Sequence, residues 1–390
     1  MLLRNMIRPM ERCLGMRLGG GDVLMWQAEL KPHATGDFSI AVVQANNSLE
    51  DQGQVVTSPS ATFVGVYDGH GGPEASRFVS SRLFPHLHKF ASEQGGLSSD
   101  AIKKAFESTE EEFLHLVKHS WLSRPKMASV GSCCLVGLIA DDTLYVANLG
   151  DSRAVLGKRG SDGKRVVAER LSTDHNAATE EVRKELTELH PDDSHIVVHT
   201  RGVWRVKGII QVSRSIGDVY LKKPEFSKDP LFQQFVSPVT LKRPVMTAEP
   251  QIRVRKLKPQ DRFVIFASDG LWEHLTDEAA VEIVFRNPRS GIAKRLVKAA
   301  LTEAAKKREM RYEDLRHIKK GVRRHFHDDI TVVVIYLDQQ RSTSRMLDTK
   351  YLFTNAPPDV FSHNSDDSGI LQQKKEASAW ELFQASSSLN

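Results

Sequence analysis

The chain has 390 residues, of which 40% are hydrophobic and 26% charged, and its formal net charge is +5. This composition is typical of a folded globular protein, and no apolar run reaches the roughly 18 residues needed to span a bilayer. The charge is modest and no basic stripe contains interleaved aromatic residues, so we expect no binding to nucleic acid. Three cysteines are too few for a disulfide framework, which favours an intracellular protein.

Residues 1–35 are predicted to form a basic N-terminal extension. Arginines are scattered there between Met, Leu and Ile, without the continuous apolar core of a secretory signal. Such a segment suits weak contact with an anionic membrane surface, and Cys13 is either a candidate for acylation or an ordinary free thiol. We therefore expect the protein in the cytoplasm or nucleus, with peripheral contact at the plasma membrane as a further option.

Residues 36–340 contain the predicted folded body. Runs rich in Val, Ile and Phe predict buried strands. The Asp141-Asp142 turn and the turn at 161–163 join neighbouring runs at hairpin distance, which favours antiparallel pairing. The predicted strands span 36–44, 61–67, 130–140, 143–149, 153–159, 164–171, 205–213, 262–268 and 329–338.

Helical patterns alternate with these strands. Pro73 fits the first turn of one helix, and Thr276 is a plausible N-cap of another. The predicted helices span 73–91, 100–121, 179–189, 276–287 and 290–310. Antiparallel strands with paired long helices predict an α+β layered sandwich. Residues 341–390 are rich in Ser, Asp and Asn without periodicity, and we predict that they form a disordered tail.

Three carboxylates stand where an apolar run meets a polar turn. Asp68 lies in ATFVGVYDGHGG, Asp269 in RFVIFASDGLWE and Asp328 in HFHDDITVVVIYL. A carboxylate at a buried strand end is costly unless it is paired, and a cluster of such groups suits a hard divalent cation such as Mg²⁺ or Mn²⁺. Each Asp alone is also explained by turn formation or helix capping. Together they predict a metal site.

Four motifs in order extend this pattern: DGHGG at 68–72, GDSRA at 150–154, SDGLWE at 268–273 and HDDIT at 327–331. From about residue 37 to 338 the chain resembles the metal-dependent Ser/Thr protein phosphatases of type 2C. The stretch 309–334 is similar to the plant clade D of that family. The resemblance implies a four-layer α-β-β-α sandwich with a central antiparallel β-sandwich, and hydrolysis of phosphoserine or phosphothreonine by a metal-activated water.

The resemblance also assigns roles to individual residues around two Mg²⁺ or Mn²⁺ ions and a weaker third. It makes Asp68 the bridging ligand, with Asp269 and Asp328 completing the site and the Gly69 carbonyl as a further ligand. Glu50 is then a ligand through water, with Asp51 behind it, and Asp151 matches the third position. His70 matches the general acid of the family.

Simpler interpretations of several of these residues stay open. Asp151 would also suit an Asx turn or an ion pair with Arg153, and His70 an ordinary loop histidine. Glu50 and Asp51 would also suit a solvated loop.

One departure from the family concerns the substrate phosphate. The family commonly has an Arg four residues before the position of Glu50, whereas this chain has Asn46. Asn offers one neutral donor in place of a charged bidentate fork. We hypothesise that Arg323 or Arg324 replaces the missing Arg; the alternative is that both only balance acidic neighbours.

The implied partners are phosphorylated proteins, and we expect a monomer. Clade D membership would further imply dephosphorylation of the C-terminal threonine of plasma-membrane proton pumps and inhibition by small auxin-induced SAUR proteins. Asn46 is the one feature that favours the alternative of a catalytically weak docking protein for kinases or receptors. A two-metal phosphodiesterase or nuclease is disfavoured because the chain lacks a nucleic-acid footprint.

Overall fold

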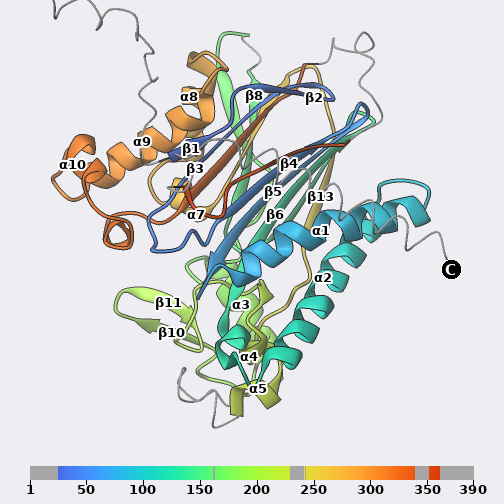
Figure 1. Cartoon of the computed structure of the whole chain (residues 1–390), viewed down its shortest axis with the longest axis vertical. Coiled ribbons are helices and arrows are strands. Elements are labelled where there is room, and N and C mark those ends of the chain that lie inside the picture. Colours follow the sequence, from blue (N-terminus) through green and yellow to red (C-terminus); the bar gives the residue numbers. More distant parts are fainter. Residues whose placement is uncertain (1–24, 161–162, 229–240, 242, 339–350, 361–390) are drawn as a thin grey trace, which may run out of the picture.

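The computed structural model describes residues 25–160, 163–228, 241, 243–338 and 351–360. Two antiparallel sheets pack face to face at its centre (Figure 1). The β3 sheet has the order β1-β3-β15-β14-β8-β9, with β2 also paired to β3. Its strands are β1 (Met25–Gln27), β2 (Lys31–His33), β3 (Gly36–Val43), β8 (Arg153–Arg159), β9 (Val166–Arg170), β14 (Asp261–Ala267) and β15 (Ile330–Tyr336).

The β5 sheet has the order β13-β7-β6-β5-β4-β16, with β12 also paired to β6. Its strands are β4 (Gln52–Thr57), β5 (Ala61–His70), β6 (Gly131–Ala140), β7 (Thr143–Leu149), β12 (Ile216–Gly217), β13 (Gln251–Lys256) and β16 (Leu352–Asn355). The predicted hairpin of β6 and β7 is confirmed: Ala140 pairs with Thr143, and Asp141 and Asp142 between them have the positive φ angles of a tight hairpin turn.

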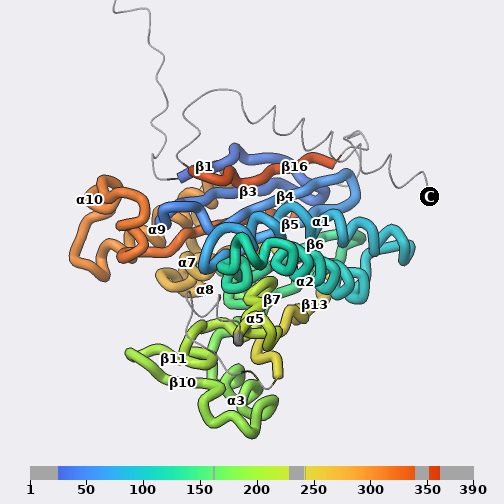
Figure 2. Tube along the Cα trace, turned by 60° about the horizontal axis from the view of Figure 1, so that its bottom comes forward, coloured from blue at the N-terminus to red at the C-terminus, as the bar shows by residue number. Residues whose placement is uncertain are grey.

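Helices cover the outer face of each sheet. On the β5 sheet these are α1 (Glu74–Glu93) and α2 (Ser99–Ser120), and on the β3 sheet α8 (Asp277–Arg286) and α9 (Ile292–Lys306). The short helices are η1 (Pro125–Ser129), α7 (Asp269–Trp272), α10 (Tyr312–Arg316) and η2 (Arg323–His325). The predicted four-layer α-β-β-α sandwich is confirmed (Figures 1 and 2).

A smaller group of elements extends from one end of the sandwich, at the foot of Figure 2. It contains α3 (Glu180–Leu189), the hairpin of β10 (Val197–Thr200) and β11 (Val203–Val206), α4 (Val219–Lys222) and α5 (Pro224–Lys228). The strand predicted over 205–213 is wrong beyond β11. Lys207 and Gly208 both have positive φ angles, which turn the chain away from an extended path.

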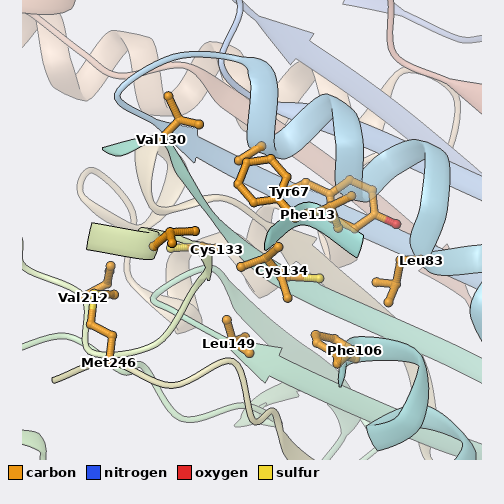
Figure 3. Packing of buried hydrophobic residues seen from close by; sticks show 14 of the residues in the cluster. Tyr67, Leu83, Phe106, Phe113, Val130, Cys133, Cys134, Leu149, Val212 and Met246 are labelled. Carbon is orange, nitrogen blue, oxygen red and sulfur yellow. The ribbon is translucent and has the colours of Figure 1, made fainter. Parts of the chain in front are cut away.

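Three layers of apolar side chains hold the sandwich together. One lies between the sheets and includes Phe38, Val64 and Phe266. A second lies under α8 and α9. The third lies between the β5 sheet and α1 and α2, where Figure 3 shows Cys133 and Cys134 among the packed side chains. Central strands are therefore buried on both faces, which explains why their sequences read as continuous apolar runs.

Three peripheral strands depart from the prediction. β1 and β2 lie within the predicted extension 1–35 but pair with β3, so the folded body begins before residue 36. β16 lies within the predicted tail 341–390, where the sequence indicated no strand. It pairs with β4, and its Phe353 ring lies 5.7 Å from the ring of Phe84. The prediction of disorder is therefore wrong for residues 351–360; residues 1–24, Cys13 included, and 361–390 lie outside the described residues.

We predict that Phe353→Ala destabilises the fold, whereas Leu352→Ala does not. Phe353 is partly buried against the apolar layer between the β5 sheet and α1 and α2, while the neighbouring Leu352 is 55% exposed. Truncating the ring should lower the free energy of unfolding by about 1–2 kcal/mol, against less than about 0.5 kcal/mol for Leu352→Ala. Urea denaturation of both variants measures this. Equal stabilities would show that β16 contributes nothing to the core.

Candidate functional site

Three aspartates from three different segments meet at one end of the sandwich. Asp68 lies near the end of β5, Asp151 in the turn between β7 and β8, and Asp269 at the start of α7. One carboxylate oxygen of each lies within 4.8 Å of the others. The backbone N–H of Asp269 donates to Oδ2 of Asp68 at 3.3 Å, which ties the two sheets together at this point. We call this group the carboxylate cluster.

The carboxylate cluster is electrostatically strained without a cation. Burial raises the pKa of Asp68 and of Asp269 well above the ordinary value, and the nearby carboxylates raise both further. Oδ1 of Asp269 is buried and accepts no hydrogen bond from any described residue. Hard oxygen ligands, mutual repulsion and an unsatisfied buried oxygen together fit a divalent cation.

Asp151 is held in place from two sides. Asn176 donates its Nδ2 to Oδ2 of Asp151 at 2.7 Å, and the thiol of Cys133 lies 3.3 Å from Oδ1. An ion pair with Arg153 does not account for its position, because Arg153 pairs with Asp174 and Asp277. Asp151 therefore lies ready to share a cation with Asp269.

Asp328 lies just before β15 and contacts the cluster electrostatically. Its Oδ2 pairs with Arg324 at 2.7 Å. Burial raises the pKa of Asp328 to about 7, although Arg324 opposes this and the charge of Asp329 adds to it. Asp328 is not part of the carboxylate cluster, although its charge raises the pKa of both Asp68 and Asp269.

Asp329, which the sequence prediction did not single out, organises the loop that carries Asn46 and Glu50. Its Oδ1 accepts the N–H groups of Ala45 and Asn46 at 2.6 and 3.0 Å, and its Oδ2 accepts the N–H of Glu50 at 2.8 Å. One buried carboxylate therefore satisfies three backbone donors. The sequence does contain a signal for this role in the two adjacent aspartates of HDDIT. Adjacent side chains at a strand end point to opposite sides, so the two must have different partners.

Glu50 and Asn46 lie together on this loop. Nδ2 of Asn46 donates to Oε2 of Glu50 at 3.3 Å. Burial, followed by the charges of Asp329 and Asp328, raises the pKa of Glu50 to about 7. Asp51 beside them is fully buried, which raises its pKa well above the ordinary value and excludes the solvated loop for this residue.

Gly69 permits a close approach between β5 and this loop. A Cβ atom at position 69 would lie 2.5 Å from the carbonyl oxygen of Glu50. The hydroxyl of Ser76, in the first turn of α1, donates to that same carbonyl. Any side chain at position 69 would therefore push Glu50 away from Asp68.

His70 is bound to a buried aspartate that the sequence prediction also missed. Its Nε2 lies 2.7 Å from Oδ2 of Asp218, and 28% of the histidine side chain is exposed. Burial alone disfavours the imidazolium, but Asp218 outweighs this and raises the pKa of His70. A Cβ atom at Gly131 would lie 2.2 Å from Asp218 and 2.4 Å from His70, so glycine makes room for the pair.

The backbone around Asp218 is shaped to present this carboxylate. Asp218 itself has φ 48° and ψ 41°, a left-handed conformation that costs about 1 kcal/mol or more outside glycine. Glu110 of α2 accepts the N–H of Gly217 at 2.9 Å and pairs with Lys222 at 2.6 Å. The sequence showed SRSIGD, but only the fold brings it to His70.

The two candidate phosphate arginines differ sharply. Arg323 is 1% exposed, so its side chain is buried inside the protein rather than open to a substrate phosphate. Arg324 is 49% exposed at its side chain and pairs with Asp328. Arg324 therefore stays the candidate, together with Asn46.

Comparisons with known proteins identify one family. Residues 33–309 match the family model described as protein phosphatase 2C. The chain is 72% identical over 377 residues to "Probable protein phosphatase 2C 78" of Oryza sativa subsp. japonica, covering 94% of this chain and 96% of that protein. It is 68% identical over 370 residues to "Probable protein phosphatase 2C 63" of Arabidopsis thaliana, covering 94% and 97%.

A solved structure supports the fold alone. The serine-threonine phosphatase 2C of Toxoplasma gondii superposes with a TM-score of 0.60 at 19% identity, covering 80% of this chain and 98% of that one.

We predict that Asp218→Asn lowers kcat while largely preserving KM. The amide keeps the shape but removes the charge that stabilises the His70 imidazolium, so kcat on a phosphothreonine peptide should fall about 10-fold to 100-fold. p-Nitrophenyl phosphate, whose leaving group needs no proton donor, should lose less. Ser215→Ala, which removes another hydrogen bond to Asp218, is the control. Equal losses on both substrates would show a purely structural role.

We predict that the metal-free protein loses stability as the pH rises from about 4 to about 7. Glu50 and Asp328 have a pKa of about 7 in the fold, against 4.5 and 3.8 ordinarily. A carboxyl that holds its proton more tightly when folded favours folding below its ordinary pKa, and this contribution disappears as the pH rises through the folded value. Bound cations should relieve the resulting repulsion.

Thermal melts with EDTA or Mg²⁺ at pH 5.5 and 7.5 measure this. Mg²⁺ should raise Tm at pH 7.5 by about 2 °C or more beyond its effect at pH 5.5. A larger effect at pH 5.5 would contradict the expectation.

Proposed function

Because this chain belongs to the protein phosphatase 2C family, we propose that it hydrolyses phosphoserine and phosphothreonine in proteins at the carboxylate cluster, with Mg²⁺ or Mn²⁺ as cofactor. The convergence of Asp68, Asp151 and Asp269, contributed by both sheets, carries this proposal. Divalent cations held by such carboxylates activate water and neutralise phosphoryl oxygens. Asp68, the Gly69 carbonyl, Asp269, Asp328 and Glu50 would hold two ions, and Asp151 a third.

The remaining residues of the site bind and protonate the substrate. His70 is exposed on one side and bound to Asp218 on the other, so it holds a proton that it can donate to the leaving serine or threonine oxygen. Arg324 pairs with Asp328 and Asn46 donates to Glu50, and both would offer donors to the phosphate. Asp329 fixes the position of the 45–50 loop, which carries Asn46 and Glu50, relative to the start of β15.

The resemblance to clade D supports a narrower proposal. The substrate would be a plasma-membrane proton pump phosphorylated on its C-terminal threonine, and SAUR-type proteins would inhibit the enzyme. No helix among the described residues is long and apolar enough to cross a membrane. The enzyme would act as a monomer inside the cell, in the cytoplasm or nucleus, with peripheral contact at the plasma membrane as a further option.

We predict that Asp269→Asn abolishes hydrolysis of two phosphothreonine peptides, one with the C-terminal pump sequence and one unrelated. Removing one ligand charge should lower kcat/KM by more than about 100-fold. The matched control is Asp100→Asn, exposed on α2 and outside the site. Phosphate release is measured with Mn²⁺, Mg²⁺ or EDTA.

The outcomes separate the alternatives. Activity of Asp269→Asn that survives EDTA would overturn the proposed function. Binding of phosphopeptides without turnover by the unmodified protein would favour the docking protein. Equal kcat/KM on both peptides would leave the phosphatase intact and remove the support for a pump-specific substrate.

A further inference from the structure

Positive charge is concentrated in one short part of the chain. Residues 292–325, from α9 to η2, contain twelve Lys and Arg but only four Asp and Glu, a net charge of +8. The whole chain carries +5, so the other residues together carry −3. We call residues 292–325 the basic lobe. Figures 1 and 2 show α9 and α10, in orange, on the side of the sandwich away from α1 and α2.

The basic lobe reaches the candidate active site through three side chains. Arg324 pairs with Asp328. Arg308 donates its Nη2 to the carbonyl of His325, the next residue, at 3.1 Å. Lys307 donates its Nζ at 2.7 Å to the carbonyl of Glu273, in the turn that follows Asp269 and α7. Lys307, Arg308 and Arg324 therefore form a basic rim beside the carboxylate cluster.

Balancing of the acidic cluster does not account for the whole rim. Arg324 fits that role, because its charge acts on Asp328, Asp269 and Glu273. Lys307 and Arg308 are exposed and donate to backbone carbonyls. The charge of Lys307 also acts on Glu273, but among the described residues neither side chain forms an ion pair with a carboxylate. Other basic residues of the lobe, such as Lys306 and Arg311, pair with acidic neighbours in their own helices. The side chains of Lys307 and Arg308 therefore present positive charge to a molecule bound beside the site.

We propose that the rim of Lys307 and Arg308 binds acidic residues that flank the phosphorylated residue of a protein substrate. This inference rests on the proposed phosphatase function and names the substrate class of that site. The occupant follows from charge complementarity: a substrate segment leaving the cluster across this rim meets cations. Without the rim, the carboxylates of the site would repel acidic residues of the substrate. With the rim, acidic substrates would bind more tightly than neutral ones.

The test uses phosphothreonine peptides of equal length with acidic residues before the phosphothreonine, acidic residues after it, or neutral residues on both sides. At least one of the two acidic peptides should have a KM about fivefold or more below that of the neutral peptide, with a similar kcat. The effect is of this size because each exposed ion pair adds only a modest binding free energy. Lys307→Ser combined with Arg308→Ser should reduce this ratio to near one. The preference should also weaken in 0.5 M salt.

Two controls separate charge from folding. Lys307→Arg combined with Arg308→Lys retains both charges and should retain the preference. Lys118→Ser, an exposed charge removed from α2, should leave the ratio unchanged. Circular dichroism melts exclude misfolding as the cause in each variant.

Other results of these assays would contradict either this inference or the proposed function. Equal KM values for acidic and neutral peptides, or a preference that persists in the double Ser variant, would overturn the inference while the phosphatase stands. Failure to hydrolyse any peptide would instead overturn the proposed function. If the lobe binds phosphatidylserine vesicles in sedimentation and shows no peptide preference, it is a lipid contact and the inference is wrong.

Discussion

The burial of many carboxylates where the two sheets meet is the constraint around which this end of the molecule is built. Asp51, Asp68 and Asp269 all have a pKa well above the ordinary value, first because of burial and then because of neighbouring carboxylates. Such a group is stable only if hydrogen bonds, cations or protons compensate the charge. In this fold hydrogen bonds compensate part of the charge, and among the described residues Oδ1 of Asp269 has no hydrogen-bond partner.

The compensation also fixes the geometry. Asp329 binds three N–H groups of the 45–50 loop, and Asp269 donates its own N–H to Asp68. Each bond joins segments that are distant in sequence, so the loop, β5, α7 and β15 cannot shift independently. Close approaches at Gly69 and Gly131 complete this arrangement, because a Cβ at either position would meet polar atoms of the site. The same residues thus carry both stability and function.

Sequence reasoning succeeded where one strong physical signal dominated. Strands buried on both faces read as apolar runs, and Asp68, Asp269 and Asp328 mark their ends. It missed β4 because that strand opens with Gln52, Gly53 and Gln54, whose polar groups are satisfied only within the fold, as in the Tyr67 to Gln54 hydrogen bond. It missed β13 and β16 because these edge strands are exposed or half-buried at most positions, so their sequences lack an apolar run.

The missed site residues share a different reason. Asp218 lies 148 positions from His70, and its segment is held by distant partners: the N–H of Gly217 donates to Glu110 of α2, and the N–H of Asp218 to the carbonyl of Val130. The choice between Arg323 and Arg324 likewise depended on the direction of two adjacent side chains in one short turn. A motif specifies which groups are present; only tertiary contacts decide which of them face the site.

A catalytic site made of carboxylates must still bind an anionic phosphate. Cations on Asp68 and Asp269 would reverse the sign of the field at the centre, but they act over a short range. Arg324 lies where the two regions of charge meet: it pairs with Asp328 on one side and adjoins Arg308 through His325 on the other. Asn46 offers one neutral donor where the family commonly has Arg, so in the proposed site the basic rim would supply the positive charge that Asn46 lacks. Under this proposal Arg324 takes part in phosphate binding, and the neighbouring Lys307 and Arg308 take part in substrate choice.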